Sequence, residues 1–259
     1  MLERRRTAEE TWWLELAAPA VAAEARPGQF VMAGFGTDQV GAPFLPRPFS
    51  IGWRGGDGRI GLLVRAFGAG TRRLAALRPG DDLLLLGPLG RPFRPSQHGP
   101  TICVAGGVGL APFLFLGSEA RCAGREIRLL YGERSAPRVF DPGLVAALTG
   151  VEPEVFTQDG SLGRPGTVLD GIAWDAGTDA GTGVAERPVL LGCGPAPMLA
   201  ALARLAAGHG ADLQVSVEEH MGCGVGTCQG CVVRTADGRW VKSCTEGPVF
   251  DARELAWPA

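Results

Sequence analysis

Hydrophobic residues in the first third of the chain come in short runs, each about the length of one strand. Turn sequences rich in glycine and proline separate the runs, as at Arg26-Pro27-Gly28 and Arg78-Pro79-Gly80. This spacing is typical of a small antiparallel β-barrel. The expected strands are residues 11–17, 29–33, 49–53, 60–67 and 82–86, and one short helix is expected at residues 71–77.

After residues 87–100, which are rich in proline and glycine, the pattern changes to strands alternating with helices. Strands are expected at residues 101–105, 126–131, 151–157 and 188–191, and helices at 111–123, 142–148 and 196–207. This alternation predicts a doubly wound α/β domain. Residues 174–187, rich in Gly, Ala, Thr and Asp, predict a mobile surface loop.

A third piece begins with residues 212–217 and continues into a cysteine-rich segment. The predicted fold class is therefore multidomain, with a β-barrel followed by an α/β domain and a small C-terminal domain. The predicted boundaries place the barrel in residues 1–97, the α/β domain in residues 98–210 and the small domain in residues 211–259.

Composition excludes several classes of protein. The chain has 259 residues, of which 46% are hydrophobic and 20% charged, as in ordinary globular proteins. Its 25 basic and 27 acidic residues are well mixed, which argues against nucleic acid as a partner. The longest apolar run, residues 102–116, is broken by glycines and Pro112, so no membrane span is predicted. No secretory signal is visible near Met1, and a cytoplasmic location is expected.

Four cysteines near the C-terminus form a C-x4-C-x2-C-x12-C array: Cys223, Cys228, Cys231 and Cys244. The spacing of the first three matches the loop that binds a plant-type 2Fe-2S cluster. Glycines interleave them, and glycine lets backbone amides approach sulfur closely. The array predicts a 2Fe-2S cluster, which is a one-electron carrier.

Other interpretations of the cysteines remain open. A structural zinc ion usually shows paired C-x2-C motifs, and a disulfide would require an oxidising compartment. Either would make the segment a zinc-stabilised or redox-sensing interaction module. Cys103 and Cys122 stand apart from the array and are interpreted as unligated core residues.

Polar and small residues of the first domain can be assembled into a flavin site. Arg47 would supply a fixed positive charge for phosphate, and Ser50 a hydroxyl for the edge of the ring system. Gly70 and Thr71 would open a helix whose amides hold a pyrophosphate. An ordinary barrel strand with an exposed arginine is the alternative.

Two glycine turns in the α/β region each follow a predicted strand and precede a helix. The first is Gly106-Gly107-Val108-Gly109, and the second is Gly192-Cys193-Gly194-Pro195, followed by Met198. Such turns can cradle a dinucleotide phosphate, and two of them would converge on one cofactor. Cys193, at a strand end, is a candidate catalytic residue or a buried small residue. Glu133 favours NAD and Arg134 favours NADP, since one suits a ribose hydroxyl and the other a 2′-phosphate.

In their order along the chain, these motifs resemble the ferredoxin-NADP reductase superfamily. Residues 218–231, followed by Cys244 and residues 247–250, resemble the electron-transfer subunits of class B dihydroorotate dehydrogenases. The resemblance implies an FAD-binding barrel, an NAD-binding domain and a 2Fe-2S domain whose cluster ligands are the four cysteines. It places FAD at Arg47, Pro48, Phe49, Ser50, Leu63, Val64, Arg65, Gly70 and Thr71.

The resemblance also implies an electron path. Hydride would pass from NADH to FAD, and single electrons would then pass to the cluster. Glu218, expected near flavin and nicotinamide, is a second candidate catalytic residue, or else only a charged strand end. The implied partner is an FMN-containing catalytic subunit that oxidises dihydroorotate, in a heterotetramer of two plus two chains. The cluster domain and residues 247–257 are expected to face this partner.

The main alternative is the small subunit of another electron-transfer flavoprotein, such as an NADH-dependent ferredoxin-NADP reductase or a sulfide dehydrogenase. A resemblance to an NADH-dependent ferredoxin-NADP reductase would imply an aspartate among the cluster ligands, whereas all four positions here are cysteine. The choice of NAD over NADP rests on the resemblance to the dihydroorotate system.

Overall fold

The computed structural model describes residues 1–36, 45–96, 99–174 and 188–258. The predicted loop at 174–187 lies outside the described residues apart from Trp174, and so does the predicted boundary between residues 97 and 98.

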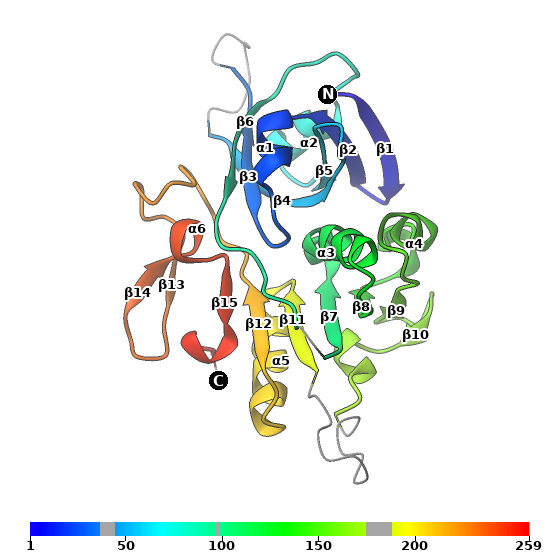
Figure 1. Ribbon diagram of the computed structural model, residues 1–259, viewed down its shortest axis with the longest axis vertical. Coiled ribbons are helices and arrows are strands. Elements are labelled where there is room, and N and C mark those ends of the chain that lie inside the picture. The colour runs from blue at the N-terminus through cyan, green and yellow to red at the C-terminus, as the bar shows by residue number, and fades with distance from the viewer. Residues whose placement is uncertain (37–44, 97–98, 175–187, 259) are drawn as a thin grey trace.

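An antiparallel sheet forms the first domain, in the order β1-β2-β5-β4-β3-β6, and curls around its own core (Figure 1). Alternation along β2 and β5 directs side chains such as Leu14, Leu62 and Val64 into that core. The strands are β1 (Glu3–Ala8), β2 (Thr11–Ala17), β3 (Phe30–Gly34), β4 (Arg47–Arg54), β5 (Arg59–Arg65) and β6 (Leu84–Leu89), and the helices are α1 (Pro19–Glu24) and α2 (Ala69–Ala75).

A second sheet, in the order β10-β9-β8-β7-β11-β12-β15, forms the α/β domain. Its strands pair in parallel except that β15 runs antiparallel to β12. The strands are β7 (Thr101–Gly106), β8 (Ile127–Glu133), β9 (Glu154–Thr157), β10 (Arg164–Pro165), β11 (Val189–Cys193), β12 (Leu213–Ser216) and β15 (Val249–Asp251).

Helices cover both faces of this sheet, which explains why β7 is buried along its whole length. One face packs against α3 (Ala111–Cys122) and α4 (Pro142–Thr149), and the other against α5 (Ala196–Gly208). Short 3-10 turns complete the domain: η1 (Gly107–Leu110), η2 (Ala136–Arg138), η3 (Val168–Gly171) and η4 (Ala252–Glu254). The predicted multidomain fold class is confirmed.

The C-terminal segment contains a hairpin of β13 (Val232–Arg234) and β14 (Trp240–Lys242), followed by the short helix α6 (Ser243–Glu246). Figure 1 shows this orange-to-red segment beside both sheets. Because β12 and β15 pair in the second sheet, that sheet extends beyond the predicted boundary at residue 210. The segment between these strands, which contains the cysteine loop (residues 223–231), therefore leaves the sheet at β12 and returns to it at β15.

Helix α3 lies between the first sheet and the second (Figure 1), and the hydrophobic core of each domain includes side chains from the other. Phe115 of this helix is fully buried within the core of the first sheet. Side chains of the first domain also enter the core of the second. Trp13 contacts Phe140 edge-on with ring centroids 6.3 Å apart, and Phe93 stacks on Phe113 with ring centroids 5.4 Å apart. This packing holds the carboxyl ends of β7 and β11 against the barrel.

We predict that Phe115→Ala lowers the free energy of unfolding by about 3–5 kcal/mol, because it leaves a cavity in a core that two domains share. Urea unfolding would measure the change. Leu205→Ala, on exposed helix surface, is the control and should change stability by about 0.5 kcal/mol or less. An equally small effect of Phe115→Ala would contradict the shared core.

Candidate functional site

A cleft of about 660 Å³ lies where the barrel meets the carboxyl edge of the second sheet. This volume is in the range of small-molecule and cofactor sites. The chain that connects β12 to the cysteine loop, from Ser216 to Gly222, forms a further wall. The lining includes these residues that the sequence predicted: Arg47, Pro48, Phe49, Ser50, Leu63, Arg65, Thr71, Val108 and Glu218.

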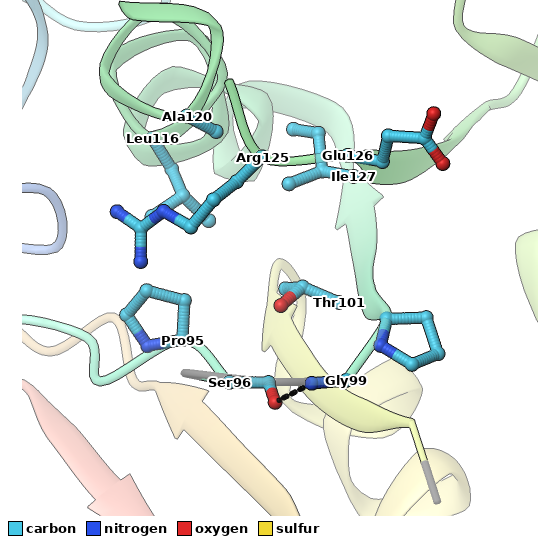
Figure 2. A pocket seen from close by; sticks show the side chains of 10 residues that line it. Pro95, Ser96, Gly99, Thr101, Leu116, Ala120, Arg125, Glu126 and Ile127 are labelled. Carbon is cyan, nitrogen blue, oxygen red and sulfur yellow. Dashed lines mark hydrogen bonds between the residues drawn. The ribbon is translucent and has the colours of Figure 1, made fainter. Parts of the chain in front are cut away.

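A second cavity, of about 340 Å³, lies at the amino ends of β7 and β8 (Figure 2). Figure 2 shows the Arg125 side chain directed toward Pro95, while Glu126 points away. Leu116 and Ala120 of α3 form its apolar side. None of the residues predicted for chemistry lines this cavity, so the cleft at the opposite edge is the candidate site.

Arg47 and helix α2 meet at one end of the cleft. A Cβ on Gly70 would collide with the Arg47 guanidinium, so glycine is needed for this close approach. The Thr71 hydroxyl accepts from the amides of Phe67 and Gly68, at 3.1 and 3.0 Å. These hydrogen bonds fix the backbone of Phe67 and Gly68 immediately before helix α2. Val64, by contrast, is fully buried in the barrel core and does not line the cleft.

The two glycine turns touch each other backbone to backbone. A Cβ on Gly194, which has a φ of +155°, would lie 3.0 Å from the Gly106 Cα, and one on Gly109 would collide with the Cys193 carbonyl. Met198 packs beneath, with its sulfur 2.6 Å from where a Gly106 Cβ would stand. This point lies between β7 and β11, where the strand order reverses and where open α/β sheets bind ligands.

Cys193 and Glu218 lie close together at this edge. Burial raises the pKa of the Cys193 thiol well above its ordinary value, the Glu218 carboxylate adds to the rise, and a hydrogen bond from Ser216 opposes it. The Cys193 thiol is therefore neutral. Glu218 reaches solvent within the cleft, but the surrounding walls desolvate it and raise its pKa, while Arg65 acts in the opposite direction.

Glu133 does not have the surroundings that the sequence suggested. Its carboxylate forms an ion pair with Arg65 of the barrel, and its side chain is only 4% exposed. The interpretation of Glu133 as an acceptor for a ribose hydroxyl is wrong, because that carboxylate is already paired across the domain interface. Its neighbour Arg134 is exposed.

The four predicted cluster ligands lie as two pairs, and among the described residues no three of them form a group that could hold one metal ion. The Cys228 amide donates to Cys223 Sγ at 3.4 Å, and Cys244 hydrogen-bonds Cys231 through their side chains. The amides of Cys228 and Val225 lower the pKa of Cys223 to about 6, whereas burial and then Cys231 raise that of Cys244 to about 11. In a 2Fe-2S cluster each iron takes two cysteine thiolates, so a paired set fits it.

The cysteine loop is docked on strand β3 of the barrel. Gly224 has a φ of +74°, and a Cβ there would collide with Met32. Cys231 and Cys244 form a small buried cluster with Phe30 and Met32. Phe30 also lines the cleft, so the cleft and the buried thiols share a side chain in their surroundings.

Two further expectations need correction. Cys103 is buried in the core as expected, but Cys122 is exposed, because it lies in the last turn of α3 on the solvent side. The tail at residues 247–257 is mostly enclosed rather than open to a partner. Strand β15 completes the second sheet, and Phe250 and Leu255 are buried.

Several cleft residues were not predicted. Phe30 and the highly exposed Phe67 line the cleft, as does Ser216, which lies opposite Cys193 in the register of β11 and β12. Phe67 ends the expected strand at residues 60–67 and lies between the predicted flavin residues Arg65 and Gly70, so its position carried a signal. Ser216 lies in residues 212–217, for which no site was predicted. Phe30 carried no signal, because it reads as an ordinary core residue.

Comparison with known proteins identifies the family. Residues 218–256 match the profile of the iron-sulfur cluster binding domain of dihydroorotate dehydrogenase B. The electron transfer subunit of dihydroorotate dehydrogenase B (NAD(+)) from Desulforamulus reducens is 35% identical over 257 residues, covering 96% of this chain and 94% of the relative. This chain belongs to that family of electron transfer subunits. The Bacillus velezensis subunit is 39% identical and covers 89% of this chain and 87% of its own.

Solved structures support the architecture. The NADH-dependent reduced ferredoxin-NADP oxidoreductase superimposes with a TM-score of 0.83 at 26% identity, covering 99% of this chain and 88% of that one. The FAD/NAD binding domain of a nitric oxide dioxygenase from Vibrio cholerae shares the fold, with a TM-score of 0.66 at 16% identity. The chain is thus an oxidoreductase subunit that carries a C-terminal iron-sulfur domain. In the part of the chain that the structure describes, no helix is both long and apolar enough to span a membrane.

We predict that Cys244→Ser removes most of the bound iron, because this buried thiol pairs with Cys231. Iron analysis and the visible spectrum would measure the loss. Cys122→Ser, at an exposed cysteine remote from the loop, should retain the cluster. Iron retained in Cys244→Ser, or zinc in place of iron in the unmodified chain, would contradict the assignment.

Proposed function

We propose that this chain passes electrons between NAD(H) and a dihydroorotate dehydrogenase catalytic subunit, using FAD in the cleft and a 2Fe-2S cluster in the cysteine loop. The supporting observation is the position of Phe30, which lines the cleft and belongs to the buried cluster that contains two of the four cysteines. A cleft-bound flavin and a loop-bound cluster would be near neighbours. The family to which the chain belongs supports the same path.

Residues of the cleft fit a flavin dinucleotide. Arg47 lies at the start of α2, where its charge and the helix amides suit a pyrophosphate. Ser50 and Thr71 line the same side, together with the apolar Pro48, Phe49 and Leu63. When bound, FAD accepts hydride as an electron pair and releases electrons singly, which joins a nicotinamide to an iron-sulfur cluster.

The glycine turns fit a nicotinamide nucleotide. The residues assigned to it are Gly106, Gly107, Val108, Gly109, Gly194, Pro195 and Met198, with Met198 packing beneath the turn rather than reaching outward. Beside these turns, Cys193 offers a neutral, buried thiol, and Glu218, which lines the cleft, offers a carboxyl with a raised pKa. Both are proposed to contact the reacting nicotinamide. NAD is preferred because the relatives are named for it.

The proposed partner is an FMN-containing catalytic subunit, in an assembly of two plus two chains in the cytoplasm. Electrons must leave through the surface near the cysteine loop. Val225 at the tip of that loop is 48% exposed, unlike the enclosed tail at residues 247–257. The loop, rather than the tail, is therefore the proposed contact.

We predict that Gly70→Ala weakens FAD binding by about tenfold, because the new methyl group displaces Arg47 from the start of α2. Flavin released on ultrafiltration would measure the affinity. Gly68→Ala is the matched control, since a Cβ there meets no atom within 4 Å and its φ is −120°. Equal flavin retention in both variants would contradict the flavin site.

Reconstitution tests the whole function. The purified chain, mixed with the FMN catalytic subunit from the same genome, should support reduction of NAD by dihydroorotate, which neither subunit supports alone. Light scattering should give the mass of two plus two chains. Activity with ferredoxin and NADP, but none with dihydroorotate, would instead favour the ferredoxin-NADP oxidoreductase that shares the fold.

A further inference from the structure

Both carboxylate oxygens of Glu133, at the end of β8, accept hydrogen bonds from protein donors. One oxygen, Oε1, accepts from the Arg65 guanidinium and from the Tyr131 hydroxyl at 3.4 Å, and Oε2 accepts from the Arg134 amide at 3.3 Å. Tyr131 is itself fixed, because its hydroxyl accepts from the Phe140 amide at 3.2 Å. Removing Arg65 from this carboxylate would leave a buried charge unpaired, which is strongly unfavourable.

Arg65 reaches from the end of β5, in the barrel, to the first glycine turn of the other domain. A Cβ on Gly107 would lie 3.5 Å from Arg65 Nη1 and 3.8 Å from Glu133 Oε1, so the ion pair lies directly on this turn. The Arg65 side chain lines the cleft and is 21% exposed, whereas that of Glu133 is 4% exposed. The arginine therefore faces any nucleotide held at the turn, and the carboxylate is behind it.

The two arginines of the cleft occupy different ends. Arg47 lies over Gly70 at the start of α2, while Arg65 lies over Gly107 at the start of η1. Arg65 is therefore assigned to the nicotinamide nucleotide and not to FAD, where the family resemblance placed it. A guanidinium in a fixed orientation binds phosphate better than one that must be ordered on binding, because its donors are already in place. The Glu133 pair supplies this fixed orientation for Arg65.

We propose that Glu133 is a positioning residue, which holds Arg65 on the Gly107 turn and so favours binding of the nicotinamide nucleotide without contacting its ribose. This inference rests on the proposed function, in which the glycine turns bind NAD(H). It also explains why an acidic residue ends this strand although its side chain is buried in an ion pair.

Steady-state NADH oxidation by the flavin-loaded chain, with ferricyanide as acceptor, tests the inference. Glu133→Gln should raise the KM for NADH about tenfold with little change in kcat, because one charge-assisted contact loses its fixed geometry. Arg65→Gln should raise KM at least as much, and the double variant should be no worse than Arg65→Gln alone. The preference for NADH over NADPH should stay unchanged in all three.

Glu154→Gln is the matched control, because it removes a carboxylate from the Arg128 ion pair on the neighbouring strand, outside the cleft. It should leave the KM unchanged. Thermal unfolding and flavin content would show whether each variant folds. If Glu133→Gln does not, Arg65→Lys keeps the charge, loses the forked geometry, and should still raise the KM for NADH.

Three results would overturn the inference while leaving the proposed function intact: an unchanged KM in folded Glu133→Gln, effects of the two single variants that multiply in the double variant, or a changed NADH/NADPH preference in Glu133→Gln alone. The last would mean that Glu133 contacts the ribose. An unmodified, flavin-loaded chain that does not oxidise NADH would overturn the proposed function and this inference with it.

Discussion

Strand β3 presents two buried side chains, Phe30 and Met32, on which the cysteine loop is packed. Gly224 allows the contact, because any larger residue there would collide with Met32. Phe30 also lines the cleft, so the same side chain belongs to the packing under the loop and to the cofactor site. This contact fixes the position of the thiols relative to the cofactor site, although loop and strand are almost two hundred residues apart in the sequence. Transfer of single electrons depends on such proximity.

The same edge of the second sheet is held against the barrel by a different contact. Phe115 of α3 fills the barrel core, and Trp13 and Phe93 of the first domain pack into the core of the second. The point where the strand order reverses therefore faces the barrel, and Val108 of the first glycine turn lines the same cleft as Arg47 and Ser50. Because the domains share side chains in their cores, the ion pair between Arg65 and Glu133 forms between groups that are already close.

Local motifs could be interpreted from the sequence where chemistry depends on backbone shape. Glycines that follow a strand, and cysteines at fixed spacing, mark turns that few other residues allow, and most strands of both sheets were expected. Strand β1 was not expected, because it is an exposed edge strand whose charged run, Arg4 to Arg6, carries no apolar alternation. Long-range partners were not predictable either. Nothing near Glu133 in the sequence shows that Arg65, from another domain, takes its carboxylate, and Val64 looked like a cofactor residue although it faces the barrel core.

An anaerobic titration of the purified chain with NADH tests most directly whether the cleft and the cysteine loop are in electronic contact. The flavin would be followed by its visible absorbance and the cluster by electron paramagnetic resonance. With NADH as the only reductant, the account predicts that the flavin bleaches and that the signal of a reduced 2Fe-2S cluster appears during the same additions. Flavin bleaching without that signal, in protein shown by iron analysis to hold the cluster, would contradict it.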